Sequence, residues 1–336
     1  MADRAFFEQA EAAGASMAAA AVRIGALDRL RRAYPVNDLV EAAAARRAIA
    51  AALARRRPRA LVLSTVTAAM LAPRLELPYA VRLDSPARLN RRGAHNRPLH
   101  ALERRRLRAA TLVLPWSEAA REALPPGAAP TVVLPPPVLA SGPRHGRPER
   151  LAVAYVPDPK AKGLDLLCGA WGQARIDGAR LEVFGIAPER ARRHLARTGV
   201  AEPPSVTFRG MVPRDEFRST LGRARAFVGA ARWEDFGQAP LEALADGALL
   251  VTLPSGGAFE ALRLARRLEP RLVAGAVCPE RLAEAIGVAF AMDEESMAAY
   301  REAAADLLDR YRPEAIVETL RELVLPALLG ATREAR

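Results

Sequence analysis

The sequence predicts an α/β protein of two doubly wound domains, on the strength of its length and of short apolar runs that alternate with helical stretches. At 336 residues, the chain exceeds the length at which single hydrophobic cores usually stop growing, so two domains are expected. Apolar residues make up 51% of the chain and charged residues 26%, which is the balance of a folded globular protein. Buried strands that alternate with helices are typical of a parallel sheet covered on both faces.

The N-terminal half is expected to begin with helices and to continue with strands. Residues 1–57 read as helical, because Ala and Arg dominate and no β-branched run occurs. Helical patterns follow over 99–110 and 118–124. Four apolar runs predict strands, at 60–66, 79–83, 111–115 and 131–135.

The alternation restarts after a segment rich in Gly, Pro and charge. This segment, residues 141–148, predicts the linker, so that residues 1–140 form an N-terminal domain and 149–315 a C-terminal one. Pro313 is a natural place for the chain to turn, after which a last helix over 316–336 could return to the first domain. Strands of the C-terminal domain are predicted at 151–156, 181–185, 205–210, 224–230 and 248–254.

The positive charge is concentrated in the N-terminal half. Residues 1–140 hold 22 Arg against 11 acidic residues, whereas residues 141–336 hold 28 basic and 27 acidic ones. A basic face would attract anionic lipid, a phosphorylated acceptor or nucleic acid. A compositional bias toward Arg and Ala explains the excess equally well. Nucleic acid is the least favoured partner, because the basic half has few aromatics and no reading motif.

The sequence favours a cytoplasmic protein, with peripheral contact at the inner face of a membrane as an open option. No run of about 18 apolar residues occurs, and acidic residues at Asp3, Glu8 and Glu11 precede any apolar stretch, which argues against a signal peptide. The two cysteines, Cys168 and Cys278, lack a CxxC spacing and cannot build a disulfide framework.

The stretch ARWEDFGQAPLEALADG, residues 231–247, is the most informative part of the chain. It holds two carboxylates, Glu234 and Glu242, with seven residues between them, and Pro240 suits the first turn of a helix. An anion such as a sugar diphosphate is favoured at a helix start, near the backbone N–H groups of Phe236, Gly237 and Gln238. On spacing alone, an ordinary surface helix with a polar start is an equal alternative.

This stretch resembles the signature of the retaining glycosyltransferase family 4. The resemblance implies a GT-B fold, in which two Rossmann-like domains face each other across a cleft. It also implies that Glu234 contacts the sugar of a nucleotide diphosphate sugar, the donor, and that Glu242 contacts its ribose.

Three further motifs are similar to those of the family and occur in its order. KAKGLDLLCGAW at 160–171 resembles the entry to the first donor-domain helix, which makes Lys162 the expected diphosphate contact. VTFRGMVPRDEF at 206–217 resembles the strand and loop beside the nucleotide base, with Gly210 and Met211 in the loop.

The third motif, PSGGAFE at 254–260, is similar to the family's glycine pair followed by Glu. The resemblance places Gly256, Gly257 and Glu260 beside the sugar and phosphates.

The sequence departs from the family at three points. Leu83 stands where the family often has a His, and the Asp84 that follows could either orient an acceptor hydroxyl or cap a turn. The Arg that usually shares the diphosphate is missing, and Lys160 is the conjectured substitute. Nothing in residues 1–57 matches the family's opening strand and glycine-rich loop, so the first domain is either trimmed or incomplete at its start.

The resemblance implies hexosyl transfer to an acceptor hydroxyl with retention, without a cofactor and without a divalent metal. Lys162 and Lys160 would stabilise the leaving diphosphate, and Glu234, Lys162 and Asp84 are the expected catalytic residues. No Asp-x-Asp occurs, and the four histidines show no ligand spacing. The acceptor is open: a glycan, a lipid-linked sugar or a small molecule.

Three other functions are compatible with parts of the sequence. They are a nucleotide-sugar epimerase or phosphorylase on the same plan, a degenerate transferase that binds a nucleotide sugar or an anionic surface without turnover, and, less favoured, a glycoside hydrolase.

Overall fold

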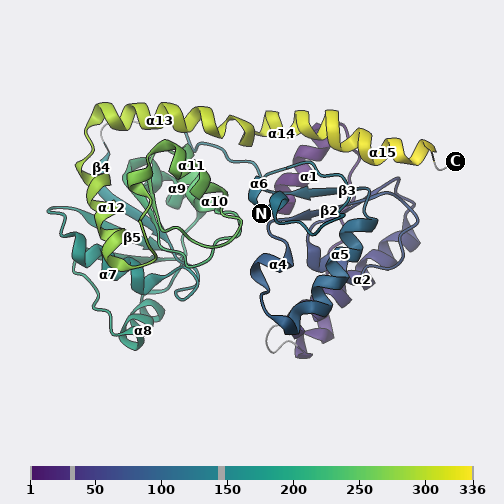
Figure 1. The fold of residues 1–336 in the computed structure, drawn as a ribbon, viewed down its shortest axis with the longest axis horizontal. Helices are drawn as coiled ribbons and strands as arrows, with labels where there is room; N and C mark the ends of the chain where they lie inside the picture. The colour runs from purple at the N-terminus through teal and green to yellow at the C-terminus, as the bar shows by residue number, and fades with distance from the viewer. Residues whose placement is uncertain (1, 31–34, 143–147, 335–336) are drawn as a thin grey trace. The chain divides into compact units, whose positions relative to one another are not determined.

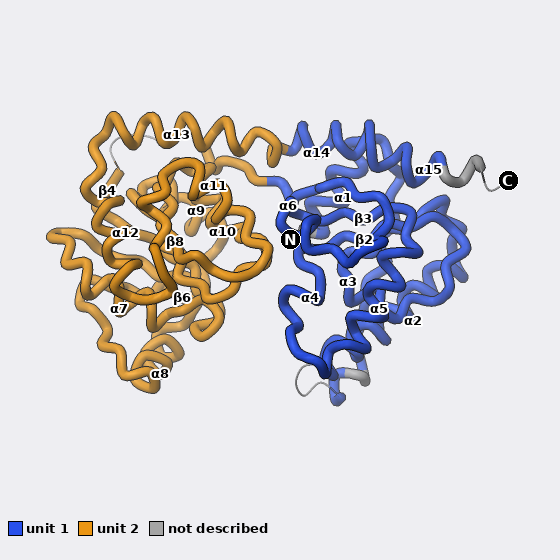
Figure 2. Tube along the Cα trace, in the orientation of Figure 1, with its two compact units in different colours: residues 1–137, 313–336 blue, residues 138–312 orange. Residues whose placement is uncertain are grey.

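The chain folds into two compact units in a computed structural model that describes residues 2–30, 35–142 and 148–334. Unit 1 comprises residues 1–137 and 313–336, and unit 2 comprises residues 138–312 (Figure 2). The polypeptide therefore passes from one unit to the other twice, at 137/138 and at 312/313.

Unit 2 is built on a five-stranded parallel sheet in the order β6-β5-β4-β7-β8. Its strands consist largely of buried apolar residues, which is typical of a sheet covered on both faces. All five predicted strands are confirmed, and each end lies within two residues of its predicted position. The strands are β4 (Glu149–Tyr155), β5 (Arg180–Phe184), β6 (Val206–Gly210), β7 (Ala224–Gly229) and β8 (Leu249–Thr252).

The helices of unit 2 form two groups (Figure 1). One group packs around α7 (Leu164–Ala174), which contacts α8 (Pro188–Thr198) and α12 (Pro279–Ala291). The other packs around α10, which contacts α9, α11 and α13. These are α9 (Arg214–Arg223), α10 (Gln238–Ala245), α11 (Glu260–Leu268) and α13 (Glu294–Leu308). The alternation of strands and helices gives the doubly wound architecture that the sequence predicts.

The strand order reverses direction beside β4. From β4 the sheet grows through β5 to β6, and the chain then returns to place β7 on the other side of β4, followed by β8. In open parallel sheets, ligands bind at the carboxyl ends of the strands at such a reversal. A ligand site is therefore expected at the loops that follow β4 and β7.

Unit 1 has a three-stranded parallel sheet of β1 (Leu61–Leu63), β2 (Tyr79–Leu83) and β3 (Leu112–Pro115). Apolar side chains from its strands contribute to two separate clusters. One contains residues of three helices, α2 (Val36–Arg55), α3 (Val66–Met70) and α5 (Arg97–Ala109). Two short helices, α4 (Ala87–Asn90) and α6 (Glu118–Glu122), follow β2 and β3.

The second cluster joins the two ends of the chain. It contains Phe6 of α1 (Ala2–Ala12) and Leu114 of β3 together with Ile316 and Leu320 from the C-terminal helices. These helices are α14 (Pro313–Thr319), a π-helical turn (Leu320–Val324) and α15 (Leu325–Glu334). The C-terminal residues are thus part of the core of unit 1.

Three predictions for unit 1 are wrong in detail. The strand predicted at 60–66 ends at Leu63, and Val66 is already the first residue of α3. Residues 1–57 are not helical throughout, because α1 ends before Gly14, which has a φ of +97°, and residues 15–24 are irregular. The predicted strand at 131–135 forms only an isolated bridge at Thr131, although Leu134 still donates a hydrogen bond to Pro115 O. Three prolines follow at 135–137 and lack the N–H groups that a ladder needs.

The chain leaves unit 1 a few residues before the predicted linker at 141–148. Residues 143–147 of that segment lie outside the described ones. Leu139 and Ser141 are already bonded to unit 2, since Arg218 donates to Leu139 O and Ser141 N donates to Asp246 Oδ1 across 2.7 Å.

Among the helices of the described residues, none is both long enough and apolar enough to cross a membrane.

Candidate active site

Three loops at the carboxyl ends of neighbouring strands meet in unit 2. They follow β4 (residues 156–163), β7 (residues 230–237) and β8 (residues 253–259). The middle loop is bonded to both others: Arg232 N donates to Ala161 O, and Glu234 N donates to Gly256 O, each across 3.0 Å. The strand-order reversal therefore carries a connected set of loops, and three of the predicted motifs lie on them.

Lys162 and Glu234 form an ion pair at this point. The ammonium of Lys162 lies 2.6 Å from Glu234 Oε2, and the side chains are 25% and 16% exposed. The structure thus brings together two residues that the sequence places 72 positions apart. Their partial exposure leaves both groups accessible to a ligand.

Glycine is required where these loops touch. A Cβ atom at Gly163, whose φ is +63°, would lie 2.1 Å from Ala230 O. A Cβ atom at Gly257, whose φ is +108°, would lie 2.1 Å from Glu234 O. Any side chain at either position would push the loop that carries Lys162 or Glu234 away from its neighbour.

The loop after β7 ends at the start of a helix. Gly237 is the N-cap residue with a φ of +90°, α10 begins at Gln238, and Pro240 lies in the first turn as predicted. Phe236, the residue before this N-cap, is buried. The N–H groups that the sequence singled out thus lie at a helix start, where the backbone dipoles favour negative charge.

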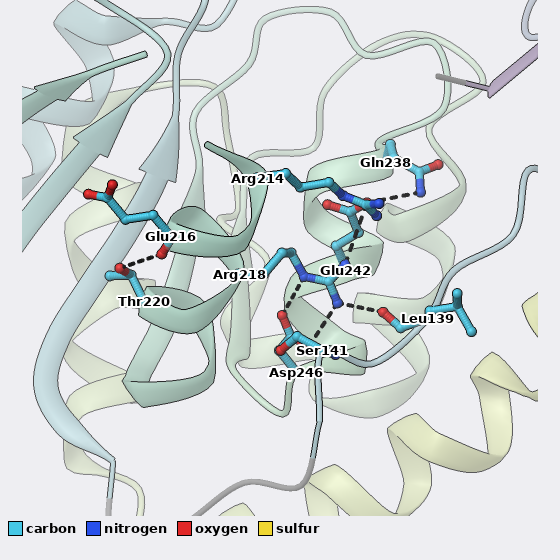
Figure 3. A network of polar contacts seen from close by, with 9 residues as sticks. All are labelled: Leu139, Ser141, Arg214, Glu216, Arg218, Thr220, Gln238, Glu242 and Asp246. Carbon is cyan, nitrogen blue, oxygen red and sulfur yellow. Dashed lines mark hydrogen bonds and ion pairs between the residues drawn. The ribbon is translucent and has the colours of Figure 1, made fainter. Parts of the chain in front are cut away.

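Glu242 is covered by arginines from the neighbouring helix α9 (Figure 3). Its Oε1 lies 2.6 Å from Arg214 Nη2 and 3.6 Å from Arg218 Nη1, and it also accepts a 3.4 Å bond from Gln238. The Glu242 side chain is only 7% exposed. The predicted ribose contact is therefore a largely buried carboxylate held by cations.

The same helices carry a second, fully enclosed pair. Arg218 bonds both oxygens of Asp246, at 2.6 and 2.7 Å, and the Asp246 side chain has no exposed area (Figure 3). Burial opposes ionisation of Arg218, but the bonds and charges of Asp246 and Glu242 outweigh it and raise the pKa of the guanidinium. Two charges balance two charges in this network, which is what a buried set of ions needs.

Arg232 links the loop that carries Lys162 to the first turn of α7. It bonds both oxygens of Asp165 and donates to Lys160 O across 3.2 Å. Partial burial works to raise the pKa of Asp165, but the bonds from Arg232 bring it below its ordinary value. Arg232 and Asp165 thus form a stable ion pair at the base of the loop.

Glu260 points to a different neighbour than its motif suggests. Its backbone N–H donates to Phe236 O across 3.2 Å, which joins the start of α11 to the β7 loop. Its carboxylate is buried and accepts a 2.7 Å bond from the hydroxyl of Tyr311. Burial, together with the Glu260 charge, raises the pKa of Tyr311, so that this hydroxyl remains a donor. A contact of Glu260 with the donor sugar stays a prediction.

The remaining predicted residues lie at the margins. Lys160 is exposed on the β4 loop, and Gly210 ends β6 with a φ of +73°. Met211 follows with 74% of its surface exposed. Asp84 belongs to unit 1, where it follows β2 and accepts a 2.7 Å bond from Ser85 N, and its role toward an acceptor stays a prediction.

Sequence reasoning missed Arg214, Arg218 and Asp246. A signal was present: the two arginines are four residues apart on α9, and Glu242 and Asp246 are four apart on α10. Residues with this spacing share one face of a helix, so two basic and two acidic positions could meet if the helices packed. Within the described ranges, no group of three His, Cys, Asp or Glu side chains is arranged to hold a metal ion.

Comparison with known proteins gives the site a family context. Residues 147–291 match the family described as "Glycosyl transferases group 1". No curated protein matches the sequence.

Solved structures match nearly the whole chain. Sucrose-phosphate synthase from Thermosynechococcus elongatus has a TM-score of 0.69 at 18% identity and covers 92% of this chain and 83% of its own. The trehalose 6-phosphate synthase of Burkholderia multivorans has a TM-score of 0.68 at 14% identity, with 91% and 78% covered. HepE from Anabaena, in complex with UDP and glucose, has a TM-score of 0.65 at 16% identity, with 90% and 83% covered. The chain therefore has the fold of GT-B glycosyltransferases with two Rossmann-like domains, and the segment that holds the site matches the glycosyl transferases group 1 family.

Proposed function

We propose that this protein transfers a hexosyl group from a nucleotide diphosphate sugar to an acceptor hydroxyl, with retention and without a metal ion, as a member of glycosyltransferase family 4. One observation carries the proposal above the others. The Lys162–Glu234 pair lies at the strand-order reversal, on loops that lead to the start of α10, and within the segment that matches the family. A cation, a carboxylate and a helix start together suit an anionic leaving group attached to a polyhydroxylated sugar.

The reaction exchanges one bond at the anomeric carbon for another. The bond from this carbon to the diphosphate oxygen breaks, and a bond to the acceptor oxygen forms on the same face of the sugar. The acceptor proton passes to the departing diphosphate, so atoms and charges balance. The energetic demand is the negative charge that grows on the diphosphate, and groups already aimed at that charge supply most of the stabilisation.

Most of the predicted residues have a role in this scheme. Lys162 and the N–H groups at the start of α10 receive the diphosphate, and Lys160 adds positive charge at the rim. Glu234 accepts hydrogen bonds from sugar hydroxyls, and Glu242 from the ribose. Gly256 and Gly257 let the β8 loop approach the middle loop closely. Asp84 orients the acceptor hydroxyl.

The similar structures suggest which compounds to test first. HepE was solved with UDP and glucose, and the trehalose-6-phosphate structure from E. coli was solved with UDP-2-fluoro glucose. A trehalose-phosphate synthase of Burkholderia xenovorans was solved with glucose-6-phosphate. Uridine donors and sugar-phosphate acceptors therefore head the panel, followed by glycans and lipid-linked sugars.

The experiment is a transfer assay with radiolabelled UDP-glucose, GDP-mannose and ADP-glucose, with and without EDTA. A thermal-shift screen with UDP, GDP and ADP first selects the nucleotide, since a ligand of the folded state raises its apparent stability. Transfer with retained anomeric configuration that survives EDTA and is lost in Glu234→Ala supports the proposal. Inversion of configuration would contradict the retaining mechanism, and loss of activity in EDTA would contradict the independence from a metal ion.

Other products would identify the alternatives. An isomerised donor without an acceptor indicates an epimerase, and phosphate-dependent cleavage a phosphorylase. Nucleotide binding without turnover across the panel indicates a binding protein.

We also propose that the protein is cytoplasmic and rests on an anionic membrane through unit 1. Exposed arginines lie on α5 and at the C-terminal end of α2, and both helices pack against α3. Those of α5 are Arg97, Arg104, Arg105 and Arg108, and those at the end of α2 are Arg55, Arg56, Arg57 and Arg59.

A further inference from the structure

The diphosphate of the proposed donor carries more negative charge than Lys162 alone can match. The β4 loop offers Lys160 as a second cation but no arginine. A guanidinium binds phosphate through two parallel hydrogen bonds and is the stronger partner where both can form. Three arginines lie near the predicted donor contacts, namely Arg214, Arg218 and Arg232, and they differ in how many of their donors are already used.

Two of these arginines are committed to protein partners. Arg232 uses both terminal nitrogens on Asp165 and one of them also on Lys160 O. Arg218 is 6% exposed and bonds Asp246 and Leu139 O. Each of these two arginines is therefore held by an ion pair and by a backbone carbonyl as well.

Arg214 is different. Its side chain is 47% exposed, and in the described part of the chain it makes one hydrogen bond, the 2.6 Å bond from Nη2 to Glu242. A guanidinium has five N–H donors, so four of them remain for a ligand.

Arg214 also lies at the relevant place. The Glu242 oxygen that it contacts accepts a bond from Gln238, the first residue of α10. Figure 3 shows the Arg214 guanidinium beside Gln238, reaching from α9 to α10. Arg214 lies three residues after Met211, within the motif at 206–217 that resembles the strand and loop beside the nucleotide base.

The charges of the network point the same way. Glu242 and Asp246 are balanced by Arg214 and Arg218. Removal of Arg214 would leave a net negative charge beside the position of an anionic ligand. Each predicted carboxylate is therefore paired with one partly exposed cation, Glu234 with Lys162 and Glu242 with Arg214.

We propose that Arg214 is a further donor-binding residue, whose guanidinium is held by Glu242 in the free chain and contacts the phosphates of a bound nucleoside diphosphate. The inference rests on the proposed function and deepens it, because it supplies the arginine that the β4 loop lacks. Glu242 keeps its ion pair with Arg218 and its hydrogen bond from Gln238, and so keeps its orientation for the ribose.

The test compares charged and uncharged ligands on matched variants. Binding of UDP, GDP and ADP and of uridine, guanosine and adenosine is measured by calorimetry for the wild type, Arg214→Met and Arg214→Gln. The control is Arg223→Met at the other end of α9, where Arg223 is 54% exposed and pairs with Glu149 at 3.0 Å. For the nucleotide that the wild type binds, both Arg214 variants should weaken diphosphate affinity about tenfold or more. Nucleoside affinity should change less than about twofold, and Arg223→Met should match the wild type.

Salt adds a second readout. The gap between wild type and Arg214→Met should narrow as salt rises from 50 to about 500 mM, because screening weakens the contact of an exposed cation with phosphate.

Each other outcome overturns the inference in a recognisable way. An equal loss of nucleoside and diphosphate affinity means that Arg214 acts only by holding Glu242. Unchanged diphosphate affinity means that Arg214 has no part in binding. A wild type that binds none of the three diphosphates overturns the proposed function itself, and this inference with it.

Discussion

The ammonium of Lys162 and the carboxylate of Glu234 neutralise each other across 2.6 Å in the free chain. A ligand that binds the ammonium must therefore also supply hydrogen-bond donors to the carboxylate. A nucleotide sugar can do both, because its phosphates accept from the lysine while its sugar hydroxyls donate to the glutamate.

Replacement of Lys162 is the first prediction. Lys162→Met should lower kcat for sugar transfer by about a hundredfold or more, because a group aimed at the leaving charge is lost. The assay is initial-rate transfer with the selected donor. Arg192→Met is the control, since Arg192 lies in the same unit in an exposed pair with Glu202. Equal rates for wild type and Lys162→Met would contradict the role of Lys162.

A glycine substitution tests the contact between the loops. Gly163→Ala should lower the free energy of unfolding by more than about 3 kcal/mol, because the new Cβ would meet Ala230 O. Gly199→Ala is a matched control: its φ of +71° is similar to that of Gly163, but no atom lies within 4 Å of the new Cβ. It should cost about 1 kcal/mol, the price of the backbone conformation alone. Urea titrations followed by circular dichroism measure both, and equal losses would show that the loops can separate freely.

The buried Glu103 predicts a pH dependence of stability in unit 1. Burial raises its pKa to about 7, against the hydrogen bond from Ala87 N and the charge of Arg91. Because the folded pKa lies above the unfolded one, the neutral form stabilises the fold at low pH, and this contribution is lost as pH rises from about 4.5 to 7. Glu103→Gln should therefore match the wild type near pH 4.5 and exceed its unfolding free energy by on the order of 1–3 kcal/mol at pH 8.

The measurement is chemical unfolding of both proteins at several pH values. The difference between them removes the contribution of all other groups. A constant difference from pH 4.5 to 8 would show that Glu103 ionises in the folded protein as it does in the unfolded one.

The basic surface of unit 1 predicts selective binding to anionic vesicles. The protein should sediment with vesicles that contain phosphatidylglycerol and not with phosphatidylcholine alone, and salt should release it. Replacing Arg97, Arg104 and Arg105 by Gln should weaken binding by on the order of tenfold or more, since each charge near the surface contributes about 1 kcal/mol. The same change at Arg192, Arg193 and Arg197, exposed on α8 of unit 2, is the control. Equal weakening by the two triple variants would mean that net charge alone is sensed.

The sheet of unit 2 could be predicted because buried parallel strands are continuous apolar runs. Residues 151–154 and 249–251 are such runs in the central strand β4 and in β8, whereas the edge strand β6 alternates buried and exposed residues. The opening 57 residues could not be predicted in the same way, since an alanine-rich chain reads as helix wherever it lies. Helix α1 ends just before Gly14, which has a positive φ, and no change in the pattern of apolar and polar residues marks this end in the sequence.

The candidate site was predictable where one short motif holds its residues and not where packing decides the partner. Lys162 and Glu234 were found because each lies in a motif with a chemical reason behind it. The bond between Glu260 and Tyr311 spans 51 positions and depends on how α11 packs near the end of α13, so no local pattern contains it. The cover that Arg214 forms over Glu242 likewise follows from the packing of α9 on α10.

The shared core of the two chain ends sets an order of events during synthesis. Ile316, Leu320, Val324 and Leu328 complete the apolar cluster that Phe6 and Leu114 begin. Domains generally fold as units while the chain emerges, the earliest ones first. Here the unit whose residues leave the ribosome first must wait for the last helices, and the later unit can finish before it. Until then, α1 is the helix of this cluster that is already made, and the part of the sheet that the last helices cover stays exposed to solvent.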